Sequence, residues 1–568
     1  LPTRSVHGLP IIEHAEFGRN VPDEAMPDED KMNLGKIYHM GKEEAAGLLL
    51  NRQAMASHTF ITGSTGTGKS NAVYHLLDEI TKNGQTTFLV VEPAKGEYKN
   101  VFGNCTDAQV FGTNPRETPL LRMNPFAFPE NIHILEHIDR LVEIFNACWP
   151  MYAAMPAVLK DAIERSYQKV GWDLRNSESE KGIFPTFFDL LDILPGVIEE
   201  SHYSKDTQSD YVGALCTRVK SLTNGIYGSV LCAEDALSDA EMFDQNVIVD
   251  LSRVGSMETK SLLMGILVMK LQEYRMCSSG MNSRLRHVTV LEEAHNLLRK
   301  TSAEQSQEGA NLQGKSVEML ANAIAEMRTY GEGFIIADQA PGLLDMSVIR
   351  NTNTKIILRL PDEEDRKLVG KSVALKEAQI DELSKLPLGV AAVYQNEWPE
   401  AVLCKIEAYP MPENAVYHKP SKMPHEINAE FVFGQLAVGK ELKPLSSSEM
   451  EQLKLWLKRH ETVLKPEDSR YLERVFAGGE LDVAKTRKAV FDFFGGIGTV
   501  VDYCAAAKKS LTPRKEFLEQ LQGQYGLKAA AADWVLNSVI SMGMSLNPDA
   551  KAVDNLRTNF EQQGGRVL

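Results

Sequence analysis

Cysteine is scarce in this sequence, with 7 among 568 residues, and no two of them form a CxxC pair. This scarcity argues against zinc ribbons and disulfide frameworks, and it is typical of proteins in a reducing cytosol. No uncharged apolar run reaches the roughly 18 residues of a membrane span, and no signal peptide is visible. We therefore expect no membrane span and a cytoplasmic location.

Positive charge is also in deficit. The 61 lysines and arginines are outnumbered by 77 aspartates and glutamates, which gives a formal net charge of −16. An acidic total disfavours a protein coated in nucleic acid, but a local basic channel remains compatible with it. Hydrophobic content is ordinary at 43%, and a chain of this length is expected to form two to four domains.

Short apolar runs alternate with helical patterns through much of the chain. This alternation predicts an α/β fold, in which helices cover both faces of a mainly parallel sheet. We expect its core in two parts, at 56–130 and 226–408, with a helical insertion at 131–225 between them. The remaining predicted parts are an N-terminal segment at 1–55, a linker at 409–448 and a C-terminal helical region at 449–568.

A phosphate-binding loop follows the apolar run TFIT. Residues 63–70, GSTGTGKS, fit the pattern GxxxxGK[ST] and stand between a predicted strand and a predicted helix. Glycines allow successive N–H groups to curl round phosphate oxygens, and the helix N-terminus adds positive potential. Lys69 would reach the β- and γ-phosphates of ATP, and Ser70 would ligate Mg²⁺. The predicted nucleotide-binding residues are Gly63, Ser64, Thr65, Gly66, Thr67, Gly68, Lys69, Ser70 and Asn71.

A second stretch, GANLQGKS at 309–316, fits the same pattern in the wrong context. The preceding residues are polar, so no buried strand would aim the loop at a ligand. We interpret this stretch as a surface loop that leads into a helix. The string HILEH at 133–137 matches a zinc-protease pattern, but no further carboxylate ligand can be identified, and we interpret it as an ordinary helix face.

Paired carboxylates end the apolar run VTVLEE. A P-loop nucleotide brings Mg²⁺ and needs a positioned water, so one carboxylate can hold the metal through its water shell and the next can activate the attacking water. We expect Glu292 on the metal side and Glu293 as the catalytic base. Asp250 also ends an apolar run, but it lacks an adjacent carboxylate and ranks below the pair. Gln339, just past the run GFIIAD, would sense the γ-phosphate or orient the water.

Four ordered blocks resemble those of HerA-type hexameric DNA translocases, in the HerA–FtsK superfamily of motor ATPases. They are HTFITGSTGTGKSN, LEEAHNLL, EMRTYGEGFIIADQAP and IRNTNTKIILRLPDEEDRKLVG, within residues 56–405. The resemblance implies a RecA-like core, a hexameric ring that hydrolyses ATP between subunits, and DNA in a central pore. It also implies a bacterial or archaeal source and a nuclease or sirtuin-like effector as partner, in DNA end processing or anti-phage defence.

The sequence departs from the family pattern at several points. The family's Asp-Glu pair is Glu292-Glu293 here, its usual Asp after the second strand is Glu92, and its N-terminal β-barrel is at best partly present in residues 1–55. The resemblance points to Arg328 as the arginine inserted into the neighbour's ATP site, with Arg350 and Arg366 as weaker candidates. Lysines on predicted loops are the candidates for DNA contact, namely Lys95, Lys99, Lys300 and Lys315.

Three functions remain open from the sequence. The first is an ATP-driven, ring-forming DNA translocase or helicase, which would follow the phosphate backbone without reading bases. The second is a nucleotide-gated scaffold whose ring recruits and activates an effector enzyme. The third is an ATPase of the conjugation or secretion type, against which the lack of a membrane span counts.

Overall fold

The computed structural model describes residues 14–19, 26–411, 415–419, 429–439 and 466–567. Short gaps within these ranges lie at 106, 153, 180–181, 234–235, 302–306, 477–478, 511, 526 and 528. The chain divides into two compact units, which are treated separately below. Unit 1 contains 1–168 and 184–419, and unit 2 contains 169–183 and 420–568.

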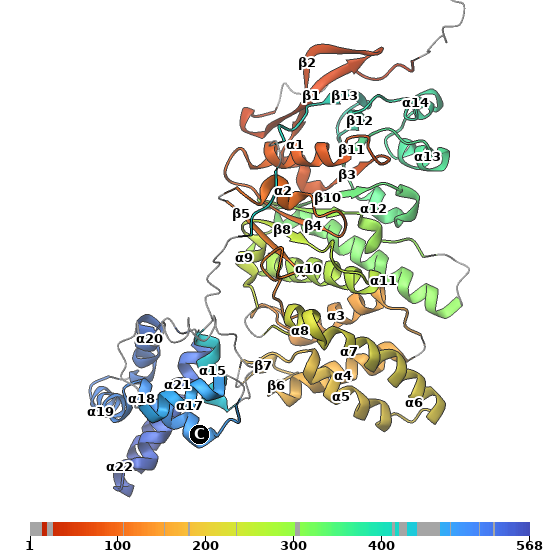
Figure 1. The fold of residues 1–568 in the computed structure, drawn as a ribbon. Helices are drawn as coiled ribbons and strands as arrows, with labels where there is room; N and C mark the ends of the chain where they lie inside the picture. Colours follow the sequence, from red (N-terminus) through yellow and green to blue (C-terminus); the bar gives the residue numbers. More distant parts are fainter. Residues whose placement is uncertain are drawn as a thin grey trace, which may run out of the picture. The chain divides into compact units, whose positions relative to one another are not determined.

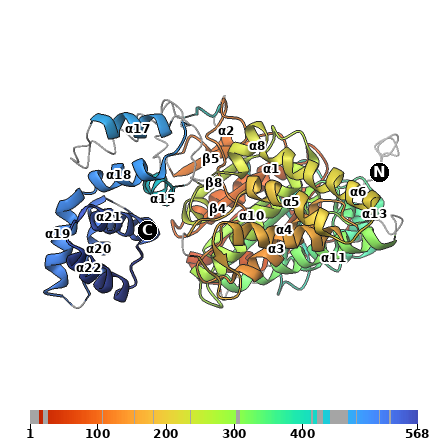
Figure 2. The same ribbon diagram turned by 90° about the horizontal axis from the view of Figure 1, so that it is seen from below.

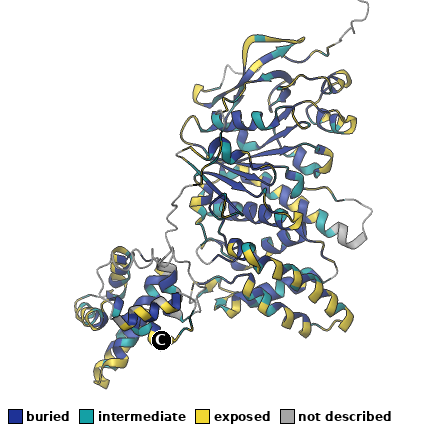
Figure 3. Cartoon of the chain, in the orientation of Figure 1, coloured by how far each residue is buried: buried dark blue, intermediate teal, exposed yellow. Residues whose placement is uncertain are grey.

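Unit 1 is built on one large sheet, with the strand order β2-β1-β13-β12-β11-β3-β10-β9-β4-β8-β5 over the described residues (Figure 1). Seven consecutive strands of this order are parallel. They are rich in Val, Ile and Phe and almost wholly buried, as expected of a sheet covered on both faces (Figure 3). These strands are β3 (Thr59–Thr62), β4 (Thr87–Glu92), β5 (Ala108–Gly112), β8 (Asn246–Asp250), β9 (His287–Glu292), β10 (Glu332–Asp338) and β11 (Thr354–Ile357). The predicted α/β class is confirmed.

Four antiparallel strands extend one side of the sheet, and the sequence analysis did not predict them. They are β1 (Lys31–His39), β2 (Lys42–Asn51), β12 (Val390–Tyr394) and β13 (Val402–Ile406). The hairpin of β1 and β2 comes from the N-terminal segment, which the sequence linked to a β-barrel. Within its described residues, that segment instead pairs with β13 on the main sheet. Residues 1–13 and 20–25 of the segment lie outside the described part.

Helices follow most of the parallel strands and place their N-termini at one edge of the sheet. Helix α1 (Lys69–Thr81) begins directly after the phosphate loop, and α2 (Tyr98–Phe102) follows β4. On α1, apolar residues from Ala72 to Ile80 pack into the core that β3, β4 and β9 also line. The edge at the carboxyl ends of the strands therefore carries the phosphate loop, Glu92, Asp250, Glu292 and Gln339.

A layer of helices covers the other face and continues into the helical region between β5 and β8. Helices α3, α10 and α11 pack against one another, and Figure 2 shows them side by side. Their bounds are Ile134–Cys148, Met257–Ser278 and Gln307–Glu326. The other helices between β5 and β8 are α4 (Met155–Lys169), α5 (Phe187–Glu200), α6 (Lys205–Tyr211), α7 (Thr217–Thr223), α8 (Gly225–Leu231) and α9 (Asp239–Phe243).

Two motif interpretations are settled by these helices. The stretch 309–316 is not the surface loop that the sequence suggested, because α11 begins at Gln307 and runs through it. An α-helix cannot wrap its amides round a phosphate, so this second GxxxxGKS is no phosphate loop. In HILEH, His137 is buried and faces Glu273 of α10 at 2.9 Å, whereas His133 caps the N-terminus of α3. The two histidines therefore have different roles.

Three further helices of unit 1 flank the antiparallel side of the sheet and the start of β11. They are α12 (Met346–Arg350), α13 (Glu363–Lys371) and α14 (Glu377–Glu382). Helices α13 and α14 pack against each other, and the carbonyl of Leu383 accepts a hydrogen bond from the N–H of Leu360 just after β11.

Unit 2 has a core of its own, formed by helices that pack round Phe433, Val490, Phe493 and Leu536. Helix α15 (Ala429–Val438) falls inside the predicted linker, and this part of the prediction is wrong. Its run AEFVFGQLAV is apolar, and it packs against α18 and α21. Residues 420–428 and 440–448 of the same linker lie outside the described part. The other helices of the unit are α17 (Pro466–Phe476), α18 (Val483–Phe493), α19 (Gly496–Ala507), α20 (Pro513–Tyr525), α21 (Ala529–Leu546) and α22 (Ala550–Gln562), beside a hairpin of β6 (Trp172–Asp173) and β7 (Glu178–Ser179).

Among the described helices, none is by itself long and apolar enough to cross a membrane. Helices α18 and α19 reach that length and composition only when they are taken together, with a bend of 67° between them.

Candidate active site

The phosphate loop connects β3 to α1 and depends on its glycines. Gly66 and Gly68 adopt φ values of +77° and +104°, which side chains disfavour. A Cβ on Gly63 would lie 2.7 Å from the Cβ of Leu358, so a side chain there would push the loop off β11. The loop is further fixed because the N–H of Ser64 donates to the carbonyl of Arg359 at 3.0 Å. The sequence thus forms a rigid, open turn at the N-terminus of a helix.

The side chain of Lys69 is buried beside the phosphate loop. It is only 7% exposed, and its ammonium has no hydrogen-bond partner in the described structure. The nearest described carboxylate oxygen is Oε1 of Glu293, 3.6 Å away. A buried cation without hydrogen bonds is costly, and an anion such as a nucleotide phosphate would satisfy it. The residues present therefore fit the predicted nucleotide.

Glu293 follows β9 in an unusual backbone conformation. Its φ of 45° and ψ of 51° lie in the left-handed region, which is uncommon for a residue with a side chain. The side-chain amide of Gln339 donates a hydrogen bond to Oε1 of Glu293, and the hydroxyl of Thr65 donates to the oxygen of the same amide at 2.6 Å. Thr65, Gln339 and Glu293 thus link the phosphate loop to the ends of β10 and β9. Strain of this kind persists where the surroundings hold a residue in place.

A histidine–aspartate pair supports Glu293 from the other side, and the sequence analysis did not assign it. Asp338 is fully buried, and its Oδ2 accepts hydrogen bonds from both the N–H and the ring Nδ1 of His295, at 2.8 and 2.9 Å. The bond to Asp338 raises the pKa of His295 above its ordinary value. Nδ1 of His295 also lies 3.6 Å from Oε2 of Glu293.

This pair also bears on metal binding. Among the described residues, Glu293, His295 and Asp338 gather three potential metal ligands within 4.8 Å of one another. Asp338 already accepts hydrogen bonds from His295 and from the N–H of Ala340. His295 and Asp338 therefore form a hydrogen-bonded pair beside Glu293, and Nδ1 of His295 lies 3.6 Å from Oε2 of Glu293. A signal was present in the sequence, since His295 stands two residues after Glu293 and Asp338 one residue before Gln339.

Glu292 lies beside the loop that follows β4. Its Oε1 accepts a hydrogen bond from the hydroxyl of Tyr98 at 2.5 Å. Burial raises the pKa of Glu292, while Lys69 and the Tyr98 hydroxyl oppose that rise. Glu292 lines the same cavity as the predicted metal ligand Ser70, and a carboxylate there suits Mg²⁺, which favours oxygen ligands and retains its own waters.

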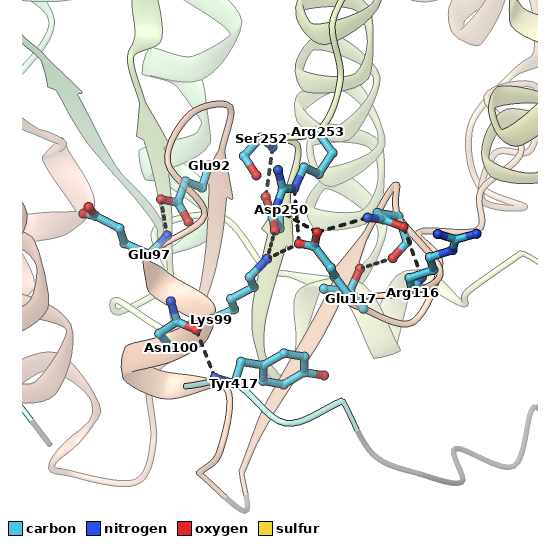
Figure 4. Close-up of polar contacts among 12 residues, drawn as sticks. Glu92, Glu97, Lys99, Asn100, Arg116, Glu117, Asp250, Ser252, Arg253 and Tyr417 are labelled. Atoms are coloured by element: carbon cyan, nitrogen blue, oxygen red, sulfur yellow. Dashed lines mark hydrogen bonds and ion pairs between the residues drawn. The ribbon is translucent and has the colours of Figure 1, made fainter. Parts of the chain in front are cut away.

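Asp250, the alternative candidate to the glutamate pair, is already paired with a lysine. Lys99 donates to its Oδ2 at 2.6 Å and to Glu117 at 3.1 Å, and Glu117 also binds Arg253 (Figure 4). Burial alone would raise the pKa of Asp250, but Lys99 and the Ser252 hydrogen bonds hold it below its usual range. Lys99 therefore neutralises Asp250 and is only 12% exposed, so its assignment as a loop lysine available to DNA is wrong.

The other lysine candidates for DNA contact differ in position. Lys315 is exposed, but it lies on α11 and not on a loop. Lys300 is exposed and follows the loop after β9, where its N–H bonds the carbonyl of Leu343. Lys95 lies in the turn between β4 and α2, at φ +63°, and its ammonium is 3.8 Å from Glu97. Residues 302–306 of the predicted 300–316 loop lie outside the described part.

The side chain of Asn71 does not face the phosphate loop, so its backbone N–H, which follows Ser70 on α1, remains as the predicted contact with the nucleotide. The side-chain amide donates to the carbonyl of Glu407 at 3.0 Å and accepts from the N–H of Tyr409 at 2.9 Å. Both side-chain groups therefore tie α1 to the segment that follows β13. These partners lie more than 300 residues away in sequence, which explains why the pattern alone could not show them.

The three arginine candidates separate by exposure. Arg366 is 9% exposed, and its guanidinium donates to the carbonyls of Leu360 and Pro361, so it cannot extend to another subunit. Arg350 is exposed at the end of α12. Arg328 is exposed in the turn Met327–Tyr330 that precedes β10. Because Gln339 follows the seven residues of β10, Arg328 lies at the opposite edge of the sheet from the ATP site, about 20 Å away along the strand.

These features together define the class of protein to which the chain belongs. The carboxyl edge of the parallel sheet brings together a phosphate loop, a buried lysine and a glutamate that follows the strand two places away. This arrangement is the site of a P-loop ATPase with a RecA-like core. The model of the family described as "Helicase HerA, central domain" matches residues 32–332. The chain belongs to this HerA family, and it is an ATP hydrolase.

Several known proteins are similar to the chain. "Probable helicase MJECL08" of Methanocaldococcus jannaschii is 23% identical over 436 residues, which cover 70% of this chain and 76% of that protein. "DNA double-strand break repair helicase HerA" of Sulfolobus acidocaldarius is 26% identical over 392 residues, or 66% and 69%. Among solved structures, VirB4 of Thermoanaerobacter pseudethanolicus matches with a TM-score of 0.51 and 18% identity, over 68% of this chain and 98% of that one. The last match shows the fold alone.

Proposed function

We propose that the protein is an ATP-driven DNA translocase or helicase, and that copies of the chain assemble into a hexameric ring, as the HerA resemblance implies. The observation that carries this proposal is the buried ammonium of Lys69, which has no hydrogen-bond partner among the described residues and lies 3.6 Å from Oε1 of Glu293. A cation able to bind phosphate and a carboxylate able to accept a proton therefore lie side by side. The similarity to archaeal repair helicases supports DNA as the substrate.

The site residues have distinct tasks in this proposal. The amides of 63–70 and Lys69 would hold the phosphates of ATP, and Ser70 and Glu292 would hold Mg²⁺, which would supply charge neutralisation on the phosphates. Glu293 accepts the proton of the attacking water, and the Gln339 amide fixes the carboxylate that does so. The preceding hydrogen bond from Thr65 makes the position of Gln339 depend on the phosphate loop.

The assembly supplies what one copy lacks. Two of the candidate arginines, Arg328 and Arg350, are exposed in the described part of unit 1. Both lie away from the phosphate loop, and Arg328 is at the far edge of the sheet. We propose that Arg328 enters the ATP site of a neighbouring subunit, with Arg350 as the alternative. A guanidinium there would stabilise charge on the transferring phosphoryl group and make hydrolysis depend on ring geometry.

A second candidate function is a nucleotide-gated scaffold that activates an effector, for which a nuclease or a sirtuin-like enzyme is the expected class. Unit 2 favours this candidate, because it has its own core and exposes apolar side chains on one face of α19, at Ile497 and Val501. The two side chains are four residues apart and therefore neighbours on the helix surface. A conjugation-type ATPase has no observation in its favour beyond the shared fold.

The proposed function is tested by movement on DNA. The protein is incubated with ATP, Mg²⁺ and a duplex that carries a labelled third strand or an annealed strand, and release of that strand is followed. ATP-dependent release that is absent in Glu293→Gln supports the motor. If ATP is hydrolysed but no strand is released on any duplex, and DNA leaves the hydrolysis rate unchanged, the scaffold replaces the motor.

A further inference from the structure

The turn between β4 and α2 is packed against the ATP site and not directed away from it. Lys95 and Gly96 adopt φ values of +63° and +70°, so the chain reverses sharply within Pro93–Glu97. A Cβ on Gly96 would lie 2.9 Å from the hydroxyl of Ser252 and 3.2 Å from Oδ2 of Asp250. The turn is therefore held tightly against the end of β8.

Glu92 holds the same turn from the inside. Its carboxylate accepts hydrogen bonds from the N–H groups of Glu97, at 2.8 Å, and Tyr98, at 3.1 Å. Burial raises the pKa of Glu92 to about 8. The backbone at the start of α2 is consequently fixed relative to the end of β4, and with it the direction in which the Tyr98 side chain leaves the chain.

Tyr98 connects this fixed backbone to Glu292. The tyrosine is 2% exposed, and its ring packs edge-on against Tyr74 of α1, with the centroids 4.9 Å apart. Its hydroxyl donates to Oε1 of Glu292 at 2.5 Å. The bond occupies one carboxylate oxygen of Glu292, leaves the other oxygen for a ligand and sets the rotamer of the side chain.

A single cavity joins the turn to the catalytic residues. It is small, with a volume of about 10 Å³, and its lining comes from the phosphate loop, the turn after β4 and the end of β9. The lining residues are Ser70, Glu92, Ala94, Lys95, Glu97, Tyr98, Glu292 and Glu293. Lys95 thus lines the same space as the predicted metal ligands, and its charge lowers the pKa of Glu292, although burial and Lys69 act more strongly on that group.

We propose that Tyr98 positions Glu292 for Mg²⁺, and that the turn Pro93–Glu97 with Lys95 is a wall of the ATP site and not a DNA-binding loop. The inference rests on the proposed function, because it assigns these residues to the same nucleotide and metal. Groups that orient a metal-binding carboxylate commonly change metal affinity or activity by about 10- to 100-fold when they are removed. Tyr98 is accordingly a positioning residue, and Lys95 is a binding residue.

The first experiment removes one hydroxyl. Tyr98→Phe keeps the buried ring and loses the bond to Glu292. Binding of a fluorescent ATP analogue without Mg²⁺ should stay within about twofold, whereas the Mg²⁺ concentration for half-maximal binding enhancement and half-maximal hydrolysis should rise about tenfold. Tyr167→Phe is the matched control, because it removes another buried hydroxyl, one that bonds the carbonyl of Phe126. An unchanged Mg²⁺ response in Tyr98→Phe would overturn the inference.

A double variant separates positioning from general destabilisation. If Tyr98 acts through Glu292, Tyr98→Phe should add no further shift in Mg²⁺ response to Glu292→Gln. Additive shifts would mean that Tyr98 acts independently, and the positioning role would be wrong. Failure of the proposed function has a different signature: wild type itself would show no Mg²⁺-dependent nucleotide binding and no hydrolysis.

The second experiment concerns Lys95. Lys95→Ala should weaken binding of the Mg²⁺-bound ATP analogue by a factor of about five, as expected for one partly exposed charge contact. The slope of log DNA affinity against log salt should stay at its wild-type value. A residue that neutralises a DNA phosphate would instead reduce that slope by about 0.9 on duplex DNA. If Lys95→Ala reduced this slope and left nucleotide binding unchanged, Lys95 would be a DNA-binding residue and not part of the ATP site. Lys300→Ala is measured in parallel, as a variant of an exposed lysine outside the turn.

Discussion

Glu293 combines a strained backbone with a hydrogen-bonded side chain, and both features restrict where its carboxylate can point. Gln339 holds one oxygen, while His295 lies 3.6 Å from the other. A general base must keep its geometry through many turnovers, and strained positions of this kind cluster at active sites. Glu293, which the sequence predicted as the catalytic base after an apolar strand, is therefore held in place by its backbone conformation and by its side-chain contacts.

Replacement of Glu293 tests this role. Glu293→Gln preserves the shape of the side chain and removes its ability to accept a proton. ATP binding should remain near the wild-type value, and turnover should fall by a factor on the order of 10² or more. Turnover is measured as phosphate release, and binding with a fluorescent ATP analogue. Near-normal turnover would remove Glu293 from the mechanism, and loss of turnover in Glu97→Gln alone would move the base to that neighbouring carboxylate.

Lys69 should control binding and not only turnover. Lys69→Ala removes the buried ammonium, which has no hydrogen-bond partner among the described residues, so affinity for the ATP analogue should drop at least tenfold, as expected for a charge-assisted contact with phosphate. Lys315→Ala is the matched control, because it changes the lysine of the second GxxxxGKS, which is exposed on α11. Equal affinities of the two variants would contradict the choice of phosphate loop.

The residues of the site differ in how far the sequence could predict them. Lys69, Glu292, Glu293 and Gln339 follow directly from apolar strands, and parallel strands bring their carboxyl ends to one edge. The hydrogen-bond partners of these side chains cannot be predicted from the strand pattern. Tyr98 reaches Glu292 across 194 positions, so only the folded register reveals the pair.

The same reason explains the wrong assignments. Lys99 looked like a loop lysine because Asp250 is 151 residues away, and the side chain of Asn71 looked like a phosphate ligand because its backbone partners lie beyond residue 400. Arg366 is the exception, since its carbonyl acceptors are five and six residues earlier. For that residue, the turn after β11 could have suggested a local structural role.

At the scale of elements, the parallel strands were predictable and the antiparallel ones were not. Strands β4, β8, β9 and β10 are continuous apolar runs that end in a charged residue, a strong pattern for a doubly covered sheet. Strand β2 reads KEEAAGLLLN and is half exposed, so its composition resembles a polar loop or helix. Pairing with β1, which itself pairs with β13 on the main sheet, makes this segment a strand.

A buried ionic cluster at the amino end of β10 joins three elements. Glu332 accepts hydrogen bonds from His287 and Thr289 of β9 at 2.8 Å and from Arg275 of α10 at 2.9 Å. Burial alone would raise the pKa of Glu332, yet His287 and Arg275 hold it below its ordinary value. The cluster fixes α10 to the edge of the sheet opposite the ATP site.

Glu332→Gln should destabilise unit 1. The variant removes one of the two carboxylate partners of Arg275 and leaves Asp244 at 2.7 Å, so the cost should lie below the about 3–5 kcal/mol of a fully uncompensated buried charge. The urea midpoint of unfolding should therefore fall, with Glu363→Gln, an exposed pair on α13, as the unchanged control. Since the folded pKa of Glu332 is depressed, its contribution is present above the unfolded value of 4.5 and disappears as the pH falls through the folded pKa. A difference between wild type and variant that persists far below pH 4.5 would contradict this account.

At the scale of the whole molecule, the proposed ring can be tested by mixing inactive subunits. Arg328→Ala should assemble but lose most ATP turnover, and so should Lys69→Ala. In mixed rings, some interfaces pair an intact phosphate loop with an intact arginine, so partial turnover should return. The same mixture with Arg350→Ala tests the alternative arginine. Full activity of Arg328→Ala alone, without complementation, would make Arg328 a structural residue.

The acidic total constrains how the molecule can bind DNA. A chain with a net charge of −16 can hold a polyanion only where basic side chains gather and acidic ones face elsewhere. Because Lys99 is paired with Asp250 and Lys95 is proposed for the ATP site, the remaining candidates for DNA contact are the exposed Lys300 and Lys315. Six copies would still multiply a small number of contacts in each subunit.

The most direct test of the account is the rate of ATP hydrolysis by the whole protein as duplex DNA is added at several salt concentrations. If the protein is a DNA motor, DNA should increase the rate, two unrelated duplexes should do so equally, and the stimulation should fall steeply as salt rises, because backbone contacts displace counterions. An ATP hydrolysis rate that no DNA changes at any salt concentration would contradict the proposed motor.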